Sequence, residues 1–272
     1  MKQKLKTIIL AFAGLIVYSA LRTVTSMMTD SVIKATLIAD IACILLGGAY
    51  MATVLKDFGP EVNANRINPK FLIASLLTVV LYSITSAYTS NYILNHISDT
   101  GFAAQQTDDA KSMLYIVLIS VFLAPVVEEL VFRGFMYRFL STGNKLAAAL
   151  ISSLIFALYH GTIVHVYAAF FGGLLFCFIF ERTKKLRYNI ASHIIFNGTT
   201  VLLSFVPYFD FMKNLWFVLL LNCVTIAAVV LIWRIQPEII VPKKVLTEAQ
   251  KQERERIAKI VDEVMAERKS GR

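Results

Sequence analysis

The chain carries a succession of apolar stretches, several of which reach the length that a helix needs to cross a lipid bilayer. The hydrocarbon core of a bilayer is about 30 Å thick, which corresponds to about 20 residues of α-helix. The stretches lie at about 7–21, 32–55, 70–94, 112–139, 146–164, 165–181, 188–206 and 215–234. With 57% apolar residues, the composition is too hydrophobic for a soluble domain. We therefore predict an all-α, polytopic membrane protein with about eight transmembrane helices.

The basic residues predict how these helices are oriented. Cytoplasmic loops of membrane proteins carry an excess of lysine and arginine. Basic residues cluster at alternate ends of the apolar stretches, within 2–6, 56–70, 138–145 and 182–187. The opposite ends carry fewer, among them Lys34, Lys111 and Lys213. This distribution places both termini in the cytoplasm, and it accounts for the formal net charge of +9 without nucleic-acid binding.

Composition also divides the chain into parts. We expect three spans in 1–111, a four-span core in 112–206, the last span in 207–241 and a tail in 242–272. The tail is rich in Glu, Lys and Arg, and Thr247 with Gln250 forms a capping-box pattern that typically opens a helix. We therefore predict a charged, helical, cytoplasmic tail after the last span.

The fourth apolar stretch contains the polar sequence Glu128-Glu129-Leu-Val-Phe-Arg133. An ionisable residue in a membrane span costs about 2.5–3.5 kcal/mol on insertion scales, so it marks a candidate functional site. Glu129 and Arg133 are four residues apart with the acid first, which predicts a buried structural ion pair. Glu128 is turned by about 100° from Glu129 and lacks such a cation. The pattern thus predicts one structural carboxylate and one that is available for chemistry.

Two later stretches add histidines with helical spacing. Phe156 and His160 share one helix face, and His193 and Asn197 share another. Together with Glu128, these residues would bring a carboxylate, two imidazoles and a carboxamide from three helices to one site that admits water. Each polar residue alone could instead form a hydrogen bond between packed helices. Their joint occurrence favours a hydrolytic site.

Two chemistries fit these residues. In the first, Glu128 with His160 acts as general base on a water molecule, while His193 and Asn197 donate hydrogen bonds to the developing oxyanion. In the second, Glu128, His160 and His193 are the three protein ligands of a catalytic zinc ion. The spacing does not decide between them, so the expected cofactor is either none or zinc.

The three motifs resemble those of the CAAX protease and bacteriocin-processing family, also called the Abi family, of intramembrane proteases. Its EExxxR, FxxxH and HxxxN patterns are matched in order, within about residues 112–206, by Glu128–Arg133, Phe156–His160 and His193–Asn197. The resemblance implies an eight-helix endopeptidase with Glu128, His160, His193 and Asn197 as catalytic residues. In this reading Glu129, Arg133 and Phe156 support the site. Members of the family have been described both as metalloproteases and as glutamate proteases.

The resemblance also implies a location, a substrate class and an alternative. It implies a multi-pass protein of a bacterial cell membrane that cleaves a membrane-associated or prenylated peptide or protein near the cytoplasmic side. The expected partners are this substrate and the lipid bilayer, with no nucleic acid. The alternative is a non-catalytic membrane scaffold or bacteriocin-immunity protein of the same family, in which the same polar groups serve helix packing.

Overall fold

The computed structural model describes residues 2–53, 66–96, 110–161, 163–206, 210–239 and 256. Clustering of contacts divides the chain into two compact units, of which the first comprises 1–63 and 67–239 and the second 64–66 and 240–272. The first unit contains the helices and the candidate site described below. Apart from the helical residue Arg256, the predicted tail lies outside the described residues.

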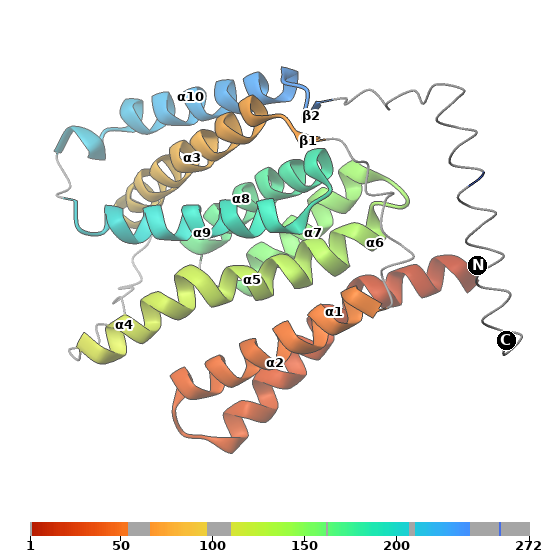
Figure 1. Cartoon of the computed structure of the whole chain (residues 1–272). Coiled ribbons are helices and arrows are strands. Elements are labelled where there is room, and N and C mark those ends of the chain that lie inside the picture. The colour runs from red at the N-terminus through yellow and green to blue at the C-terminus, as the bar shows by residue number, and fades with distance from the viewer. Residues whose placement is uncertain are drawn as a thin grey trace, which may run out of the picture. The chain divides into compact units, whose positions relative to one another are not determined.

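The described residues are predominantly helical, which confirms the all-α class (Figure 1). The helices are α1 (Lys2–Met28), α2 (Val32–Thr53), α3 (Pro69–His96), α4 (Ala110–Leu118), η2 (Ile119–Leu123), α5 (Ala124–Glu129), η3 (Leu130–Tyr137), α6 (Arg138–Leu140), α7 (Lys145–Tyr159), α8 (Ile163–Thr183), α9 (Leu186–Leu203), η4 (Asp210–Lys213) and α10 (Leu215–Arg234). Two short strands, β1 (Arg66–Ile67) and β2 (Glu238–Ile239), form a two-stranded sheet.

Each predicted apolar stretch corresponds to a helix or, for 112–139, to the helical run from α4 to α6. Among the described residues, six helices are long and apolar enough to cross a membrane, and this confirms a polytopic membrane protein. The helices α7 and α9, of 15 and 18 residues, are not among the six. The count of eight spans therefore stays a prediction.

The run from α4 to α6 is interrupted by two π-helical stretches, η2 and η3, on either side of the adjacent glutamates. Pro125 lies in the first turn of α5, directly after η2. Proline has no backbone N–H, and its ring clashes with the carbonyl four residues earlier, so the regular α-helical pattern cannot continue through this position. Because π-helical turns are frequent at functional sites, this irregularity marks the segment that contains Glu128 and Glu129.

The π-helix η3 lies at the centre of the bundle. All eight of its residues are buried. It packs against α1, α2, α7, α8 and α9, while α3 lies between α9 and α10 and α1 pairs with α2 as a hairpin (Figure 1). The segment that carries the first motif is therefore surrounded by the helices that carry the other two.

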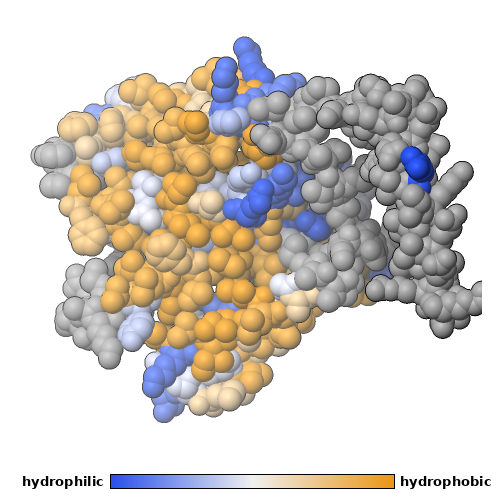
Figure 2. Space-filling model, viewed as in Figure 1, coloured by the Kyte–Doolittle hydropathy of each residue, from blue (hydrophilic) through white to orange (hydrophobic). Residues whose placement is uncertain are grey.

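The outer surface of the first unit is strongly apolar. Figure 2 shows hydrophobic residues over most of the described surface in that view. Large hydrophobic side chains such as Leu45, Trp216, Ile226 and Leu231 are more than half exposed. Apolar patches of this extent are rare on soluble monomers but are expected where helices face lipid.

Gly173 of α8 contacts Ser153 of α7 so closely that a side chain has no room. A Cβ atom at Gly173 would lie 2.9 Å from the Ser153 Cβ and 3.1 Å from its Cα. We expect Gly173→Ala to push α7 and α8 apart and to lower the free energy of unfolding by about 1–3 kcal/mol. Gly48→Ala is the matched control, because nothing lies within 4 Å of the added Cβ. Thermal unfolding in detergent measures both, and equal melting temperatures would contradict this packing.

Candidate functional site

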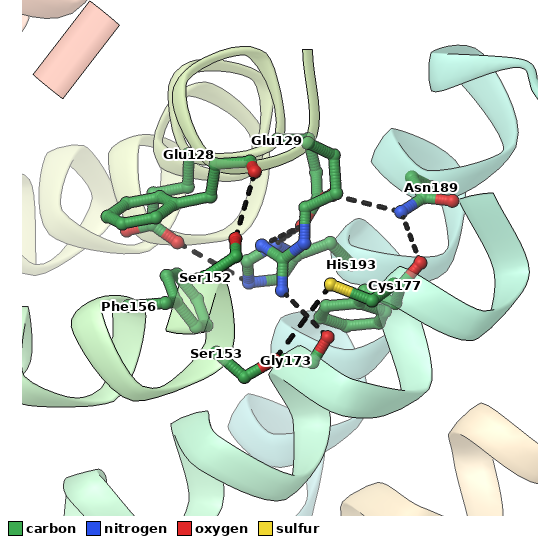
Figure 3. A network of polar contacts seen from close by, with 12 residues as sticks. Glu128, Glu129, Ser152, Ser153, Phe156, Gly173, Cys177, Asn189 and His193 are labelled. Atoms are coloured by element: carbon green, nitrogen blue, oxygen red, sulfur yellow. Dashed lines mark hydrogen bonds and ion pairs between the residues drawn. The ribbon is translucent and has the colours of Figure 1, made fainter. Parts of the chain in front are cut away.

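Glu129, the last residue of α5, is the centre of a buried polar network (Figure 3). Its Oε1 accepts a hydrogen bond from Arg133 Nη1 at 3.0 Å, and its Oε2 accepts one from Asn189 Nδ2 at 3.1 Å. Glu129 and Arg133 are both fully buried, so the expected ion pair is present in the interior. Such a pair persists in a buried site only when further hydrogen bonds satisfy the charged groups. Here Glu129 has such partners in Asn189 and His193, whereas the Arg133 Nε has none among the described residues.

Arg133 is held by aromatic rings and a backbone carbonyl in addition to Glu129. The centre of its guanidinium group lies 4.6 Å from the ring centroid of Phe156 and 5.4 Å from that of Phe176. Its Nη2 donates to the carbonyl oxygen of Gly173 at 3.2 Å. Cation–π contacts of this kind stabilise a desolvated cation, so Phe156 supports the arginine as well as the histidines described next.

His193 of α9 lies between the two glutamates. Its Nδ1 is 2.9 Å from Glu129 Oε1, and its Nε2 is 3.5 Å from Glu128 Oε2 (Figure 3). An ionised carboxylate can only accept hydrogen bonds, so Nδ1 carries a proton and donates a hydrogen bond to Glu129. This bond fixes the imidazole with its Nε2 directed at Glu128. Arg133, Glu129, His193 and Glu128 therefore form a continuous polar chain.

Glu128 is the accessible end of this chain. Its side chain is 15% exposed, compared with 4% for His193 and 0% for Glu129. The two adjacent carboxylates thus have different surroundings, one enclosed and fully bonded, the other reachable from outside the network. Their division into a structural and a chemical carboxylate stays a prediction about role.

The apolar stretch 146–164 predicted a helix that continues beyond His160. In the structure His160 instead lies at the C-terminal end of α7. The helix ends at Tyr159, because Gly161 adopts a left-handed conformation with φ 76° that is typical of a helix terminus. The His160 Nδ1 donates to the Phe156 carbonyl at 2.8 Å. The Phe156 ring contacts both imidazoles, with centroid distances of 4.7 Å to His160 and 5.9 Å to His193.

The short length of α7 has a consequence for water access. Fifteen residues of α-helix span about 22 Å, less than the hydrocarbon core of a bilayer. If α7 starts at the membrane surface near Lys145, the backbone beyond Tyr159 leaves the helix at membrane depth. Irregular backbone is tolerated there only where it is buried in protein or lines a water-filled space. This end of α7 is thus a suitable place for water to approach the site.

Asn197 lies one turn beyond His193, but its Nδ2 donates to the backbone carbonyl of Ser120 at 2.7 Å. This bond joins α9 to η2. The structure brings Glu128, Glu129, Arg133, Phe156 and His193 into one network, places His160 beside Phe156, and directs the Asn197 amide elsewhere. The predicted oxyanion role of Asn197 stays a prediction.

Two further residues of the site were not predicted from the sequence. Asn189 bonds to Glu129 and also donates to the Phe176 carbonyl at 2.8 Å. It precedes His193 by four residues, and this spacing is a signal that it shares the helix face of His193. Ser152 donates to the Phe132 carbonyl at 3.0 Å and joins α7 to η3, and no sequence pattern indicates it.

Zinc would require Glu128, His160 and His193 to converge. Among the described residues, no three His, Cys, Asp or Glu side chains are grouped so that they could hold a metal ion. Glu128 and His193 approach each other, whereas His160 bonds to the Phe156 carbonyl. This arrangement does not form the three-ligand site, so we derive no chemical step through a metal, and zinc stays a prediction.

Comparisons with known proteins agree with the motifs. Residues 110–199 match the family model described as type II CAAX prenyl endopeptidase Rce1-like. The chain is 25% identical over 182 residues to YdiL of Bacillus subtilis (strain 168), provisionally named a membrane peptidase, and covers 75% of that protein and 66% of its own length. It is 33% identical over 99 residues to the membrane-embedded CAAX protease MroQ of Staphylococcus aureus (strain USA300), covering 40% of that protein and 34% of its own length. No solved structure matches the chain significantly.

Proposed function

We propose that the chain is an intramembrane endopeptidase, since residues 110–199 match the Rce1-like family model of CAAX endopeptidases and the chain is a polytopic membrane protein. The observation that carries the proposal is the polar chain from Arg133 through Glu129 and His193 to Glu128. The first three members are buried and mutually bonded, so they hold the last one in place. A positioned carboxylate at the accessible end of such a chain is suited to act as a general base.

The reaction follows from this arrangement. Glu128 takes a proton from a water molecule as the water oxygen bonds to the scissile carbonyl carbon. The C–N bond then breaks, and the leaving amine takes the proton from Glu128. His193, fixed by Glu129, orients the Glu128 carboxylate in its imidazolium form, in which Nε2 also carries a proton and faces Glu128 Oε2. General base catalysis of this kind contributes typically about 10²–10⁴-fold to the rate.

The substrate is proposed to be a membrane-associated peptide or protein, and prenylated ones are candidates because the family description names that activity. An apolar cavity of about 340 Å³ lies between α1, α2 and η3. Its lining includes Leu130 and Val131, which directly follow Glu129, together with Gly14 and Gly47 of the hairpin. This cavity is a suitable place for the apolar part of a substrate near the site.

Mass spectrometry of peptide termini tests this proposal for any protein substrate in the membrane. Bacterial cells that lack the chain receive either the wild type or Glu128→Gln at equal abundance, and the termini in their membrane proteins are compared. We expect new termini in the wild type that are absent from Glu128→Gln. Identical sets of termini would contradict the endopeptidase and favour a role that does not depend on catalysis.

A further inference from the structure

The hairpin of α1 and α2 contributes a buried polar pair near the site. The Tyr18 hydroxyl donates to Asp40 Oδ1 at 2.8 Å. Asp40 is fully buried, and its Oδ2 has no hydrogen-bond partner among the described residues. An incompletely bonded carboxylate is costly inside a membrane span, so helix packing alone does not account for it. Such a group calls for a functional explanation.

Tyr159, the last residue of α7, contacts Tyr18 of this pair and Phe132, which follows Glu128 by four residues in the chain. Its ring centroid is 6.1 Å from that of Tyr18 and 6.2 Å from that of Phe132. The Tyr159 side chain is 42% exposed, so it is accessible beside the accessible carboxylate of the site.

An anchoring role at the membrane surface does not explain this position. Tyrosines that serve as anchors lie at the level of the lipid headgroups. Tyr159 instead packs against Tyr18 and Phe132, which lie inside the candidate spans Leu5–Met28 and Leu114–Leu140. It also stands about 21 Å along α7 from Lys145. Its ring is therefore placed within the candidate membrane region and against the segment that carries the proposed base.

We propose that Tyr159 is a further catalytic residue, whose hydroxyl donates a hydrogen bond to the scissile carbonyl oxygen while Glu128 activates the water. Tyr18 and Asp40 are positioning residues that hold the Tyr159 ring from the hairpin side. This inference rests on the proposed function. It supplies a donor for the developing oxyanion, a task for which the Asn197 Nδ2 is less available because it donates to the Ser120 carbonyl.

Tyr159→Phe tests the inference. The probe is a fluorogenic peptide that carries a Glu128-dependent cleavage site identified in membranes, and the purified full chain is reconstituted in lipid vesicles. We expect kcat to fall by about 10²–10³-fold, the usual effect of removing one oxyanion donor, with KM nearly unchanged. Tyr167→Phe is the matched control, because it removes a hydroxyl in α8 that bonds to Asn222 Oδ1 at 3.1 Å, away from this cluster. Its kcat should equal that of the wild type.

The positioning role of Asp40 has a separate readout. Asp40→Asn should lower kcat less than Tyr159→Phe does, and the double variant should be little slower than Tyr159→Phe alone, because both changes act through one hydroxyl. Independent, multiplicative losses in the double variant would overturn the positioning role. Thermal unfolding identifies any variant that loses activity through misfolding.

The remaining outcomes separate this inference from the proposed function. Wild-type kcat in Tyr159→Phe, together with an inactive Glu128→Gln, would overturn the role of Tyr159 alone. The same loss in Tyr167→Phe as in Tyr159→Phe would overturn it as well. Cleavage by Glu128→Gln at the wild-type rate would overturn the proposed function itself.

Discussion

Glu128→Gln is expected to slow peptide-bond cleavage by about 10²–10⁴-fold while leaving the fold intact. Glutamine has nearly the same size as glutamate but cannot take a proton from water. The Glu128 side chain is partly exposed and its contact with His193 Nε2 is 3.5 Å long, so the exchange removes no short buried bond. The rate at which uncut substrate disappears from membranes measures the effect, with protein abundance determined in the same samples.

Glu181→Gln provides the control for this change. Glu181 is also a partly exposed carboxylate, but it pairs with Lys145 and Lys184 away from the network of Glu128. Its replacement should leave the cleavage rate near that of the wild type. An equal loss of rate in both variants would show that the effect does not come from a base at Glu128.

Arg133→Met is expected to lower the free energy of unfolding by about 3–5 kcal/mol, the usual cost of breaking a buried ion pair. The replacement fills similar volume but leaves Glu129 as a buried charge without its cation. Chemical denaturation in detergent measures the change. Lys145→Met is the comparison, because it also removes the partner of a carboxylate but at a position whose side chain is 66% exposed, where such pairs contribute at most about 1 kcal/mol.

A second substitution separates the charge from the volume of Arg133. Adding Glu129→Gln to Arg133→Met removes the uncompensated charge, while the new amide oxygen can still accept from His193 Nδ1. The double variant should therefore be more stable than Arg133→Met alone. Glu129→Gln could instead lower the free energy of unfolding of Arg133→Met by as much as it lowers that of the wild type. The two side chains would then not be energetically coupled, and the proposed network would be wrong.

The sequence predicted the helices well because apolar length determines what can cross a bilayer. The stretch 215–234 coincides with α10, and 70–94 lies within α3. The end of α7 was not predicted, because it depends on the left-handed conformation of Gly161 within a stretch that remains apolar on both sides. The π-helical turns around the two glutamates likewise have no periodic signature.

The site could be predicted in part. The spacing of Glu129 and Arg133 was enough to predict their ion pair, because both lie on one helix. The bond between Glu129 and His193 joins residues of different helices, and helical periodicity does not say which faces meet. For the same reason the contacts of Tyr159 with Tyr18 and Phe132 emerge only from the arrangement of α1, α7 and η3. Single-helix patterns thus indicated the candidate residues, whereas their partners required the fold.

The most direct test of the central claim is cleavage by the purified full chain in lipid vesicles, with the membrane-derived fluorogenic peptide and with both product termini identified by mass spectrometry. The account predicts that the wild type cuts the peptide at one bond and that Glu128→Gln, equally folded and abundant, cuts it at least about 10²-fold more slowly. Cleavage by Glu128→Gln at the wild-type rate, or no cleavage by the folded wild type, would contradict it.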